Sequence, residues 1–303
     1  MDFHTFALAS REFVDLSTED LTRNAEIAAW FSDGLRKITE TWPGLAFCGV
    51  GLFRQNWVLH PTILIDVSIL KIDVPTEQLT PVVDTLGLEE FLRGAFGEIP
   101  TTHIKALHVL PVEESFLHTA PGEEIFASIP GSVGPFVQWD GVNQGFLTAG
   151  HVAQTPGTWV KDIHGQTIGV TVWTNDPALA PHPVGDVDVA VVALHQSTNH
   201  PAQSLVVPGA GHSLTVCANG QSSEIYAFLD PVKLGNAQAW YAKCYATEEK
   251  ITTNGDSGST VMSGNHIAGM VIGGFNQRDM SIVQSTEYQL SEIRQRSNLM
   301  VSI

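Results

Sequence analysis

The sequence predicts a mainly β protein in which a small α/β unit precedes a larger β domain. Over roughly residues 1–112, a long helical pattern is followed by runs rich in branched and apolar residues, which is typical of a mixed α/β unit. After Pro111, helical periodicity disappears, and glycine and proline become frequent between short apolar runs. We therefore expect an N-terminal α/β domain over residues 1–112 and a β domain over residues 113–303.

The N-terminal unit is expected to begin with a helix from about Ser17 to Trp42. Residues 17–20 offer an N-cap and first-turn acids, and apolar residues between Ala25 and Ile38 recur at helical spacing. Pro43-Gly44 ends this pattern. The other elements expected here are strands at 45–54, 62–72 and 103–110 and a short helix at 86–96.

The second domain is divided by turn-forming dipeptides, which favours many short strands. These dipeptides are Pro121-Gly122, Pro130-Gly131, Pro156-Gly157, Pro208-Gly209 and Asn254-Gly255. The runs between them predict strands at 136–139, 145–149, 167–173, 187–194, 213–218 and 266–272. A final helix is expected at 288–297.

Charge excludes two classes of partner. The chain of 303 residues carries a formal net charge of −17. Nucleic acid and anionic membranes attract proteins of the opposite sign, so neither is expected as a partner. No window offers the roughly 18 uninterrupted apolar residues of a membrane-spanning helix.

Cysteine content and the first residues favour a cytoplasmic location. Residues 1–24 mix acidic and basic side chains without a long apolar run, so they do not predict a secretory signal. Cys48, Cys217 and Cys244 are too few and too scattered for a disulfide framework. The sequence leaves open whether Cys217 and Cys244 pair.

Three short segments carry residues typical of nucleophilic catalysis: Thr148-Ala149-Gly150-His151, Asp188-Val189-Ala190-Val191 and Gly255-Asp256-Ser257-Gly258. In this order they resemble the histidine, aspartate and serine motifs of chymotrypsin/trypsin-like serine proteases, over roughly residues 113–303. The resemblance implies a double β-barrel protease domain and a serine endopeptidase that needs no cofactor or metal.

The chemistry of nucleophilic catalysis explains why each residue of the predicted triad is needed. A serine hydroxyl is a poor nucleophile unless an adjacent base takes its proton, which assigns Ser257 and His151. A carboxylate against the far imidazole nitrogen fixes the tautomer and stabilises the imidazolium. Asp188 is the favoured carboxylate, but Asp186 competes because residues two apart on a strand share a face. The resemblance assigns the oxyanion hole to the backbone N–H groups of Gly255 and Ser257.

Asp256 raises the question of activation. In zymogens of the family this aspartate pairs with a newly freed N-terminal amine. No typical activation site occurs here, because residues 128–134 lack a preceding basic residue. We therefore expect an internal donor to hold Asp256, and the enzyme to be active as a single chain or switched by something other than that cleavage.

Specificity is expected to be apolar. The family's specificity position, six residues before the nucleophile, is Ile251, and the pocket wall is expected at Ile272, Gly273 and Gly274. An isoleucine cannot select a basic residue, so an apolar residue before the scissile bond is predicted. Ile272 and Ser259 depart from the serine and glycine common at these positions, which leaves the pocket's shape open.

Three other functions compete with this interpretation. An α/β-hydrolase esterase would need the order serine, acid, histidine and a glycine where Ser259 stands. A metalloenzyme would need a third ligand beside His195 and His200. The serious alternative is a protease-fold protein with a binding or regulatory role and latent or no activity.

The N-terminal unit resembles the small domain that precedes the protease in some bacterial trypsin-like proteins. Gly49-Val50-Gly51 and Lys71 carry this resemblance. The unit could contact a regulatory partner or serve a purely structural role, while a protein or peptide is the expected substrate.

Overall fold

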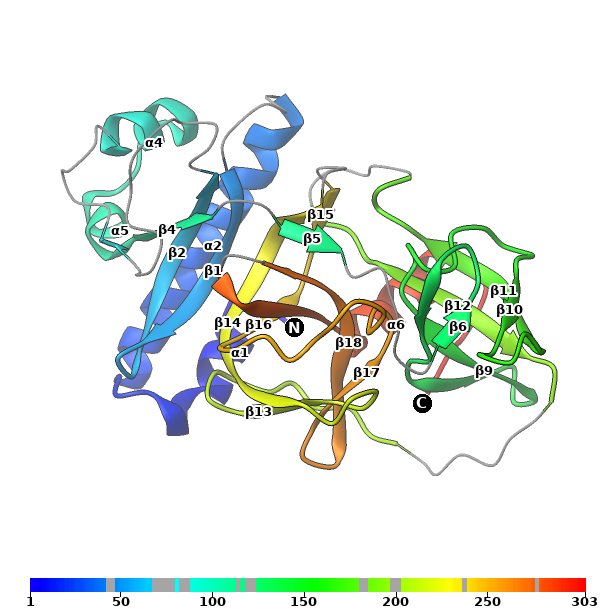
Figure 1. Ribbon diagram of the computed structural model, residues 1–303. Coiled ribbons are helices and arrows are strands. Elements are labelled where there is room, and N and C mark those ends of the chain that lie inside the picture. Colours follow the sequence, from blue (N-terminus) through cyan, green and yellow to red (C-terminus); the bar gives the residue numbers. More distant parts are fainter. Residues whose placement is uncertain are drawn as a thin grey trace.

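The computed structural model describes residues 1–41, 47–66, 80–81, 88–112, 115–117, 124–179, 185–196, 203–235, 239–275 and 278–303. Their strands form two sheets, one of twelve strands and one of seven, with helices at both ends of the chain (Figure 1). The predicted mainly β fold class is confirmed. No helix within these ranges is long and apolar enough to cross a membrane.

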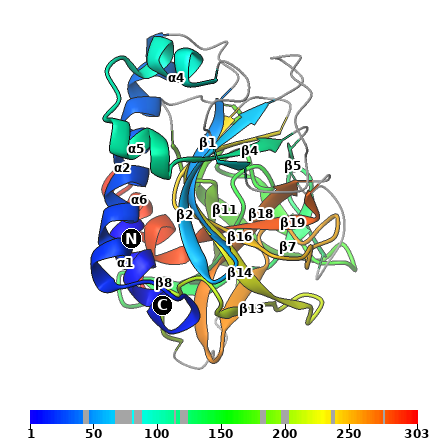
Figure 2. The ribbon, with the colours of Figure 1, turned by 90° about the vertical axis from the view of Figure 1, so that its left-hand side faces the viewer.

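The N-terminal helices cover one face of the larger sheet. These are α1 (Phe3–Ala9), the short 3-10 helix Arg11–Phe13, α2 (Thr18–Thr41), α4 (Leu88–Phe96) and α5 (Thr101–Ala106). Figure 2 shows α1, α2, α4 and α5 together along the side of β1 (Phe47–Gln55) and β2 (Val58–Asp66). The predicted helix to Trp42 matches α2, although Trp42, Pro43-Gly44 and Lys71 lie outside the described residues.

One predicted element was wrong in part. The strand expected at 103–110 is instead the helix α5 followed by the strand β4 (His108–Val112). Pro100 stands at the N-cap of α5 with a φ of −55°, and proline is well suited to the start of a helix. The strand begins only after Leu107, whose backbone is extended.

The larger sheet contains strands from both predicted domains. Its order is β13-β17-β18-β19-β16-β14-β1-β2-β4-β3, where β14 spans Ser222–Leu234 and β3 spans Thr80–Pro81. The remaining strands of this path are β13 (Ser213–Val216), β16 (Cys244–Thr247), β17 (Thr260–Ser263), β18 (His266–Phe275) and β19 (Met280–Ser285). Off the path, β15 (Ala239–Tyr241) pairs with β14, and β5 (Ser115–Leu117) pairs with β18.

The two predicted domains share a core. β1 runs antiparallel to β14, with Leu52 opposite Phe228, and one cluster of buried side chains joins Phe6, Phe31 and Val271. The boundary near residue 112 stays a prediction, but the segments on its two sides are continuous through one sheet.

The smaller sheet has the order β7-β6-β10-β11-β12-β9-β8. Its strands are β6 (Glu124–Phe126), β7 (Pro130–Ser132), β8 (Phe136–Trp139), β9 (Asn143–Thr148), β10 (Trp159–Lys161), β11 (Thr167–Asn175) and β12 (Val189–Leu194). The helix α6 (Thr286–Arg296) follows β19 and packs Leu290 and Ile293 against this sheet's core. Four of its strands, β8, β9, β11 and β12, match predicted runs in position. The three cysteines of the chain remain thiols.

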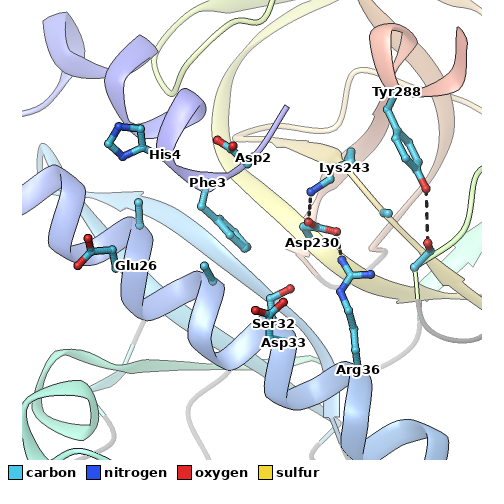
Figure 3. A pocket seen from close by; sticks show the side chains of 14 residues that line it. Asp2, Phe3, His4, Glu26, Ser32, Asp33, Arg36, Asp230, Lys243 and Tyr288 are labelled. Atoms are coloured by element: carbon cyan, nitrogen blue, oxygen red, sulfur yellow. Dashed lines mark hydrogen bonds and ion pairs between the residues drawn. The ribbon is translucent and has the colours of Figure 1, made fainter. Parts of the chain in front are cut away.

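An ionic contact fastens α2 to the larger sheet. Arg36 of α2 donates to Asp230 of β14 at 2.6 Å, and Lys243 pairs with the other oxygen of the same carboxylate (Figure 3). Asp230 is buried, so removing either cation would leave a charge poorly compensated. A cavity of about 550 Å³ lies beside this contact, and none of the predicted catalytic or pocket residues lines it.

Candidate active site

His151, Asp188 and Ser257 meet where the two sheets approach. His151 follows β9, Asp188 precedes β12 of the smaller sheet, and Ser257 precedes β17 of the larger one. The His151 Nδ1 lies 2.6 Å from Asp188 Oδ2, and its Nε2 lies 2.9 Å from Ser257 Oγ. The residues predicted from three separate motifs therefore form one hydrogen-bonded chain.

Hydrogen bonds hold both the side chain and the backbone of Asp188. Its Oδ1 accepts from the His151 backbone N–H at 3.0 Å, while its own backbone N–H donates to Gln284 Oε1 at 2.9 Å. The Gln289 amide donates to its carbonyl at 3.3 Å. These contacts fix the carboxylate, and through it the plane of the imidazole.

The competing aspartate has a different partner. Asp186 accepts from Arg296 of α6 at 2.5 Å and receives the Val187 N–H on the same oxygen. It is also buried, so it serves a structural ion pair between the smaller sheet and α6. The structure therefore brings Asp188, and not Asp186, to the histidine.

Close backbone approach dictates the glycine before the histidine. A Cβ built on Gly150 would lie 1.9 Å from the Asn175 carbonyl oxygen and 3.0 Å from Asp188 Oδ1. Only glycine lets β9 end against β11 at this distance, since any side chain would push the histidine away from the aspartate.

The nucleophile loop is fastened to the smaller sheet. The Ser132 hydroxyl donates to the Gly255 carbonyl at 2.7 Å, and the Ser132 N–H donates to the Ser257 carbonyl at 2.8 Å. The Thr148 hydroxyl in turn donates to the Ser132 carbonyl at 2.9 Å. Gly255 has a φ of +99°, a conformation that glycine adopts without strain. The loop therefore presents a fixed backbone beside the hydroxyl of Ser257.

Asp256 is held by internal donors, as expected. Its Oδ2 accepts from the Asn219 amide at 2.9 Å and from the Thr253 N–H at 2.7 Å. The Asn219 amide also donates to the Ile251 carbonyl at 3.1 Å. A single asparagine thus connects the acidic residue of the nucleophile loop to the predicted specificity segment.

The predicted pocket residues separate into two environments. Ile251 and Ile272 are both buried, but they belong to different hydrophobic clusters, one shared with the N-terminal helices and one under β14 and β19. Gly273 and Gly274 lie on β18, paired with Ile282 and Ser281 of β19. Their role in substrate specificity stays a prediction.

A second carboxyl group lies near the triad. Asp176 follows β11, and its Oδ1 accepts from the Ala178 N–H at 2.9 Å. Burial, together with the charge of Asp188, raises the pKa of Asp176 above its ordinary value.

Several residues of this site were not anticipated from the sequence. Asn219, Gln284 and Ser132 each stand in segments without a motif, 37, 96 and 123 positions from the residues whose atoms they contact. No signal in the sequence singles them out, because their function depends on pairings between distant strands.

Comparisons with known proteins find similarity in structure and not in sequence. No family model and no curated protein matches the chain. The chain is similar to chymotrypsin-like serine proteases. The Nocardiopsis protease shows 18% identity and a TM-score of 0.45 over 61% of this chain and 99% of its own. The Thermobifida fusca protease A shows 19% identity and a TM-score of 0.44 over 58% and 96%.

A third solved structure is similar to this chain to the same degree. The Cellulomonas bogoriensis chymotrypsin shows 17% identity and a TM-score of 0.44 over 58% of this chain and 96% of its own. These values are too low to say anything of activity, which has to be inferred from the geometry of the site.

Proposed function

We propose that this protein is a serine endopeptidase that cleaves peptide bonds through an acyl-enzyme intermediate. The observation that carries the proposal is the unbroken chain of hydrogen bonds from Asp188 through His151 to Ser257, with heavy-atom distances of 2.6 and 2.9 Å. A hydroxyl, a base and an orienting carboxylate in this order are the arrangement that activates a serine for acyl transfer.

The reaction follows from these contacts. Ser257 Oγ attacks the carbonyl carbon of the scissile bond while its proton moves to His151 Nε2. The carbonyl oxygen becomes an oxyanion, which the backbone N–H groups of Gly255 and Ser257 are proposed to stabilise. His151 then gives the proton to the leaving amine, which breaks the C–N bond. Water, deprotonated by the same histidine, hydrolyses the ester and restores the serine.

The preferred substrate is proposed to carry an apolar side chain before the scissile bond. Support comes from the apolar side chains of Ile251 and Ile272 and from the absence of side chains at Gly273 and Gly274. We further propose that the enzyme acts in the cytoplasm, and that a partner contacting the N-terminal helices could regulate it.

The proposal is tested by the new N-termini that the protein produces. Denatured proteome extracts are incubated with wild type or with Ser257→Ala, and the new N-termini are identified by mass spectrometry. We expect N-termini that only the wild type produces, mostly preceded by apolar residues. Identical sets from the two proteins would contradict a peptidase that is active without a further trigger, and a strict basic preference would contradict the apolar pocket alone.

The alternative is a protease-fold protein that binds without cleaving. Ser257 and His151 are 0% and 3% exposed, so the reactive hydroxyl is closed to solvent in this conformation. All three residues of the triad are present and in contact. A closed site with an intact triad therefore favours a latent enzyme over a protein that has lost its catalytic activity.

A further inference from the structure

The strand β18 has an edge that lies next to the proposed nucleophile. Along residues 260–270, β17 pairs with β18 on one side, and its last pair joins Thr260 to Met270. On the other side β19 pairs with β18 as far as Phe275. Residues 273–275 therefore lie beyond the end of β17, where they would expose a row of backbone N–H and C=O groups.

That edge is occupied by a segment of the same chain. β5 runs antiparallel to β18, with Leu117 opposite Gly273, Phe116 opposite Gly274 and Ser115 opposite Phe275. β5, coloured teal in Figure 1, comes from the connection between the two predicted domains, more than 150 positions before β18. The pairing places this connection on two glycines that were predicted to form the pocket wall.

The direction of β5 matters as much as its position. From Ser115 to Leu117 the strand passes from Phe275 toward Gly273, and so toward Val271. The Val271 backbone is bonded to the nucleophile loop, since its carbonyl accepts from the Gly258 N–H at 2.9 Å and its N–H donates to Ser259 at 3.0 Å. β5 thus runs along the edge toward the loop that carries Ser257.

The burial of the reactive groups agrees with an occupied edge. Ser257 and His151, at 0% and 3% exposure, cannot meet a substrate carbonyl unless some part of the structure moves. An extended peptide gains its affinity by adding as a strand to an open sheet edge, so an edge that is already paired offers it little.

We propose that Ser115–Leu117 is an internal occupant of the peptide-binding edge, which closes the enzyme to extended peptides until this strand leaves. The inference rests on the proposed peptidase function and adds a means of control to it. Both β5 and an extended peptide substrate would hydrogen-bond to the backbone of residues 273–275. Only one of them can therefore pair with this edge at a time.

The test uses prolines to release β5. Neighbouring residues of a strand direct their N–H groups to opposite sides, so Phe116→Pro with Leu117→Pro removes one donor facing β18 whichever residue supplies it. The matched control, Phe116→Ala with Leu117→Ala, keeps both backbone N–H groups. Hydrolysis is followed with an extended tetrapeptide substrate and with a small single-residue ester that does not need the edge.

We expect the proline variant to raise kcat/KM for the tetrapeptide by about tenfold or more, since the apparent affinity scales with the fraction of open molecules. The alanine variant is expected to stay within about twofold of wild type, and the ratio of tetrapeptide to ester activity should rise only with prolines. Equal tetrapeptide activity in wild type, alanine and proline variants would overturn the inference.

A binding measurement separates this inference from the proposed function. In a Ser257→Ala background, a labelled peptide with the sequence of residues 112–119 is expected to bind when the prolines are present and to bind weakly without them. Equal binding in the two backgrounds would overturn the occupied edge. A third outcome is that the peptide binds only when the prolines are present, while the same variant with Ser257 intact cleaves nothing. That result would support β5 as the occupant of the edge and would refute the proposed peptidase activity.

A third readout needs no proline. Hydrogen exchange of the Ser115–Leu117 amides in Ser257→Ala is expected to speed up when the tetrapeptide substrate is added in excess, because the two strands compete for one edge. Unchanged exchange with saturating tetrapeptide would contradict the competition even if the proline variant failed to fold.

Discussion

His151 is buried, whereas His60 and His108 are half-buried, and the groups around them differ. His151 lies between a carboxylate and a hydroxyl, with hydrogen bonds on both ring nitrogens. His60 of β2 and His108 of β4 instead stack on each other, with ring centroids 4.0 Å apart. Burial, with the neighbouring His60 as a second cause, lowers the pKa of His108 to about 4. Burial alone therefore does not make a base; the groups that face the imidazole decide its chemistry.

The largest expected effect comes from removing the partner of His151. Asp188→Asn keeps the size of the side chain but removes the negative charge that orients and stabilises the imidazolium, so kcat is expected to fall by about 10⁴. The folded structure should change little, which circular dichroism can check. The matched variant Asp186→Asn weakens only the ion pair with Arg296, and we expect it to lower the Tm with far less effect on kcat. Similar kcat losses in both variants would contradict the assignment.

The second effect concerns the loop that presents Ser257. Asn219→Ala removes one donor to Asp256 and one to the Ile251 carbonyl. The nucleophile loop loses part of its support, so kcat is expected to fall by roughly tenfold to a hundredfold. Gln221→Ala, at an exposed position of the same turn, serves as the control and should retain full activity. Full activity in Asn219→Ala would show that the Asn219 amide is dispensable for the nucleophile loop.

The stacked pair predicts sensitivity to acid. Because the pKa of His108 is lower in the folded state than in the unfolded one, the neutral ring contributes stability that is present above about pH 6.5 and is lost as the pH falls toward about 4. His108→Gln removes one titrating ring from the pair. After allowance for solvent screening, we expect it to reduce the fall in Tm between pH 7 and pH 4.5 by roughly 2–4 °C.

The control for this measurement is His164→Gln, at an exposed loop position. It should leave the acid-induced fall in Tm as in wild type. If His108→Gln and His164→Gln behave alike, the stacked pair is not a source of acid lability.

The smallest effect is expected at Asp176. Its pKa is raised in the folded state, so its contribution to stability is present below its ordinary pKa near 3.8 and is lost as the pH rises. Asp176→Asn keeps the oxygen that accepts from Ala178 and removes the charge, so at pH 7 the Tm should rise by roughly 1–3 °C. At pH 3 the two proteins should unfold together. A lower Tm at pH 7 would show that the charge stabilises the fold.

Features that depend on short sequence motifs could be predicted, whereas features that depend on pairing between distant strands could not. The three segments around His151, Asp188 and Ser257 were identifiable because each is a compact motif whose order along the chain is informative. The internal support of Asp256 was expected from the lack of an activation site, but Asn219 as its donor was not. The pairing of β1 with β14 and of β5 with β18 joins residues more than 150 positions apart, and neither register leaves a local pattern.

The central claim is that His151 activates the hydroxyl of Ser257, and covalent labelling tests it most directly. A small fluorophosphonate is added to wild type, to His151→Ala and to the variant with prolines at 116 and 117, and the adduct is located by mass spectrometry. We predict a single adduct on Ser257 that forms in wild type and in the proline variant and is absent without the histidine. No adduct even in the proline variant, or one that forms equally well without His151, would contradict the claim.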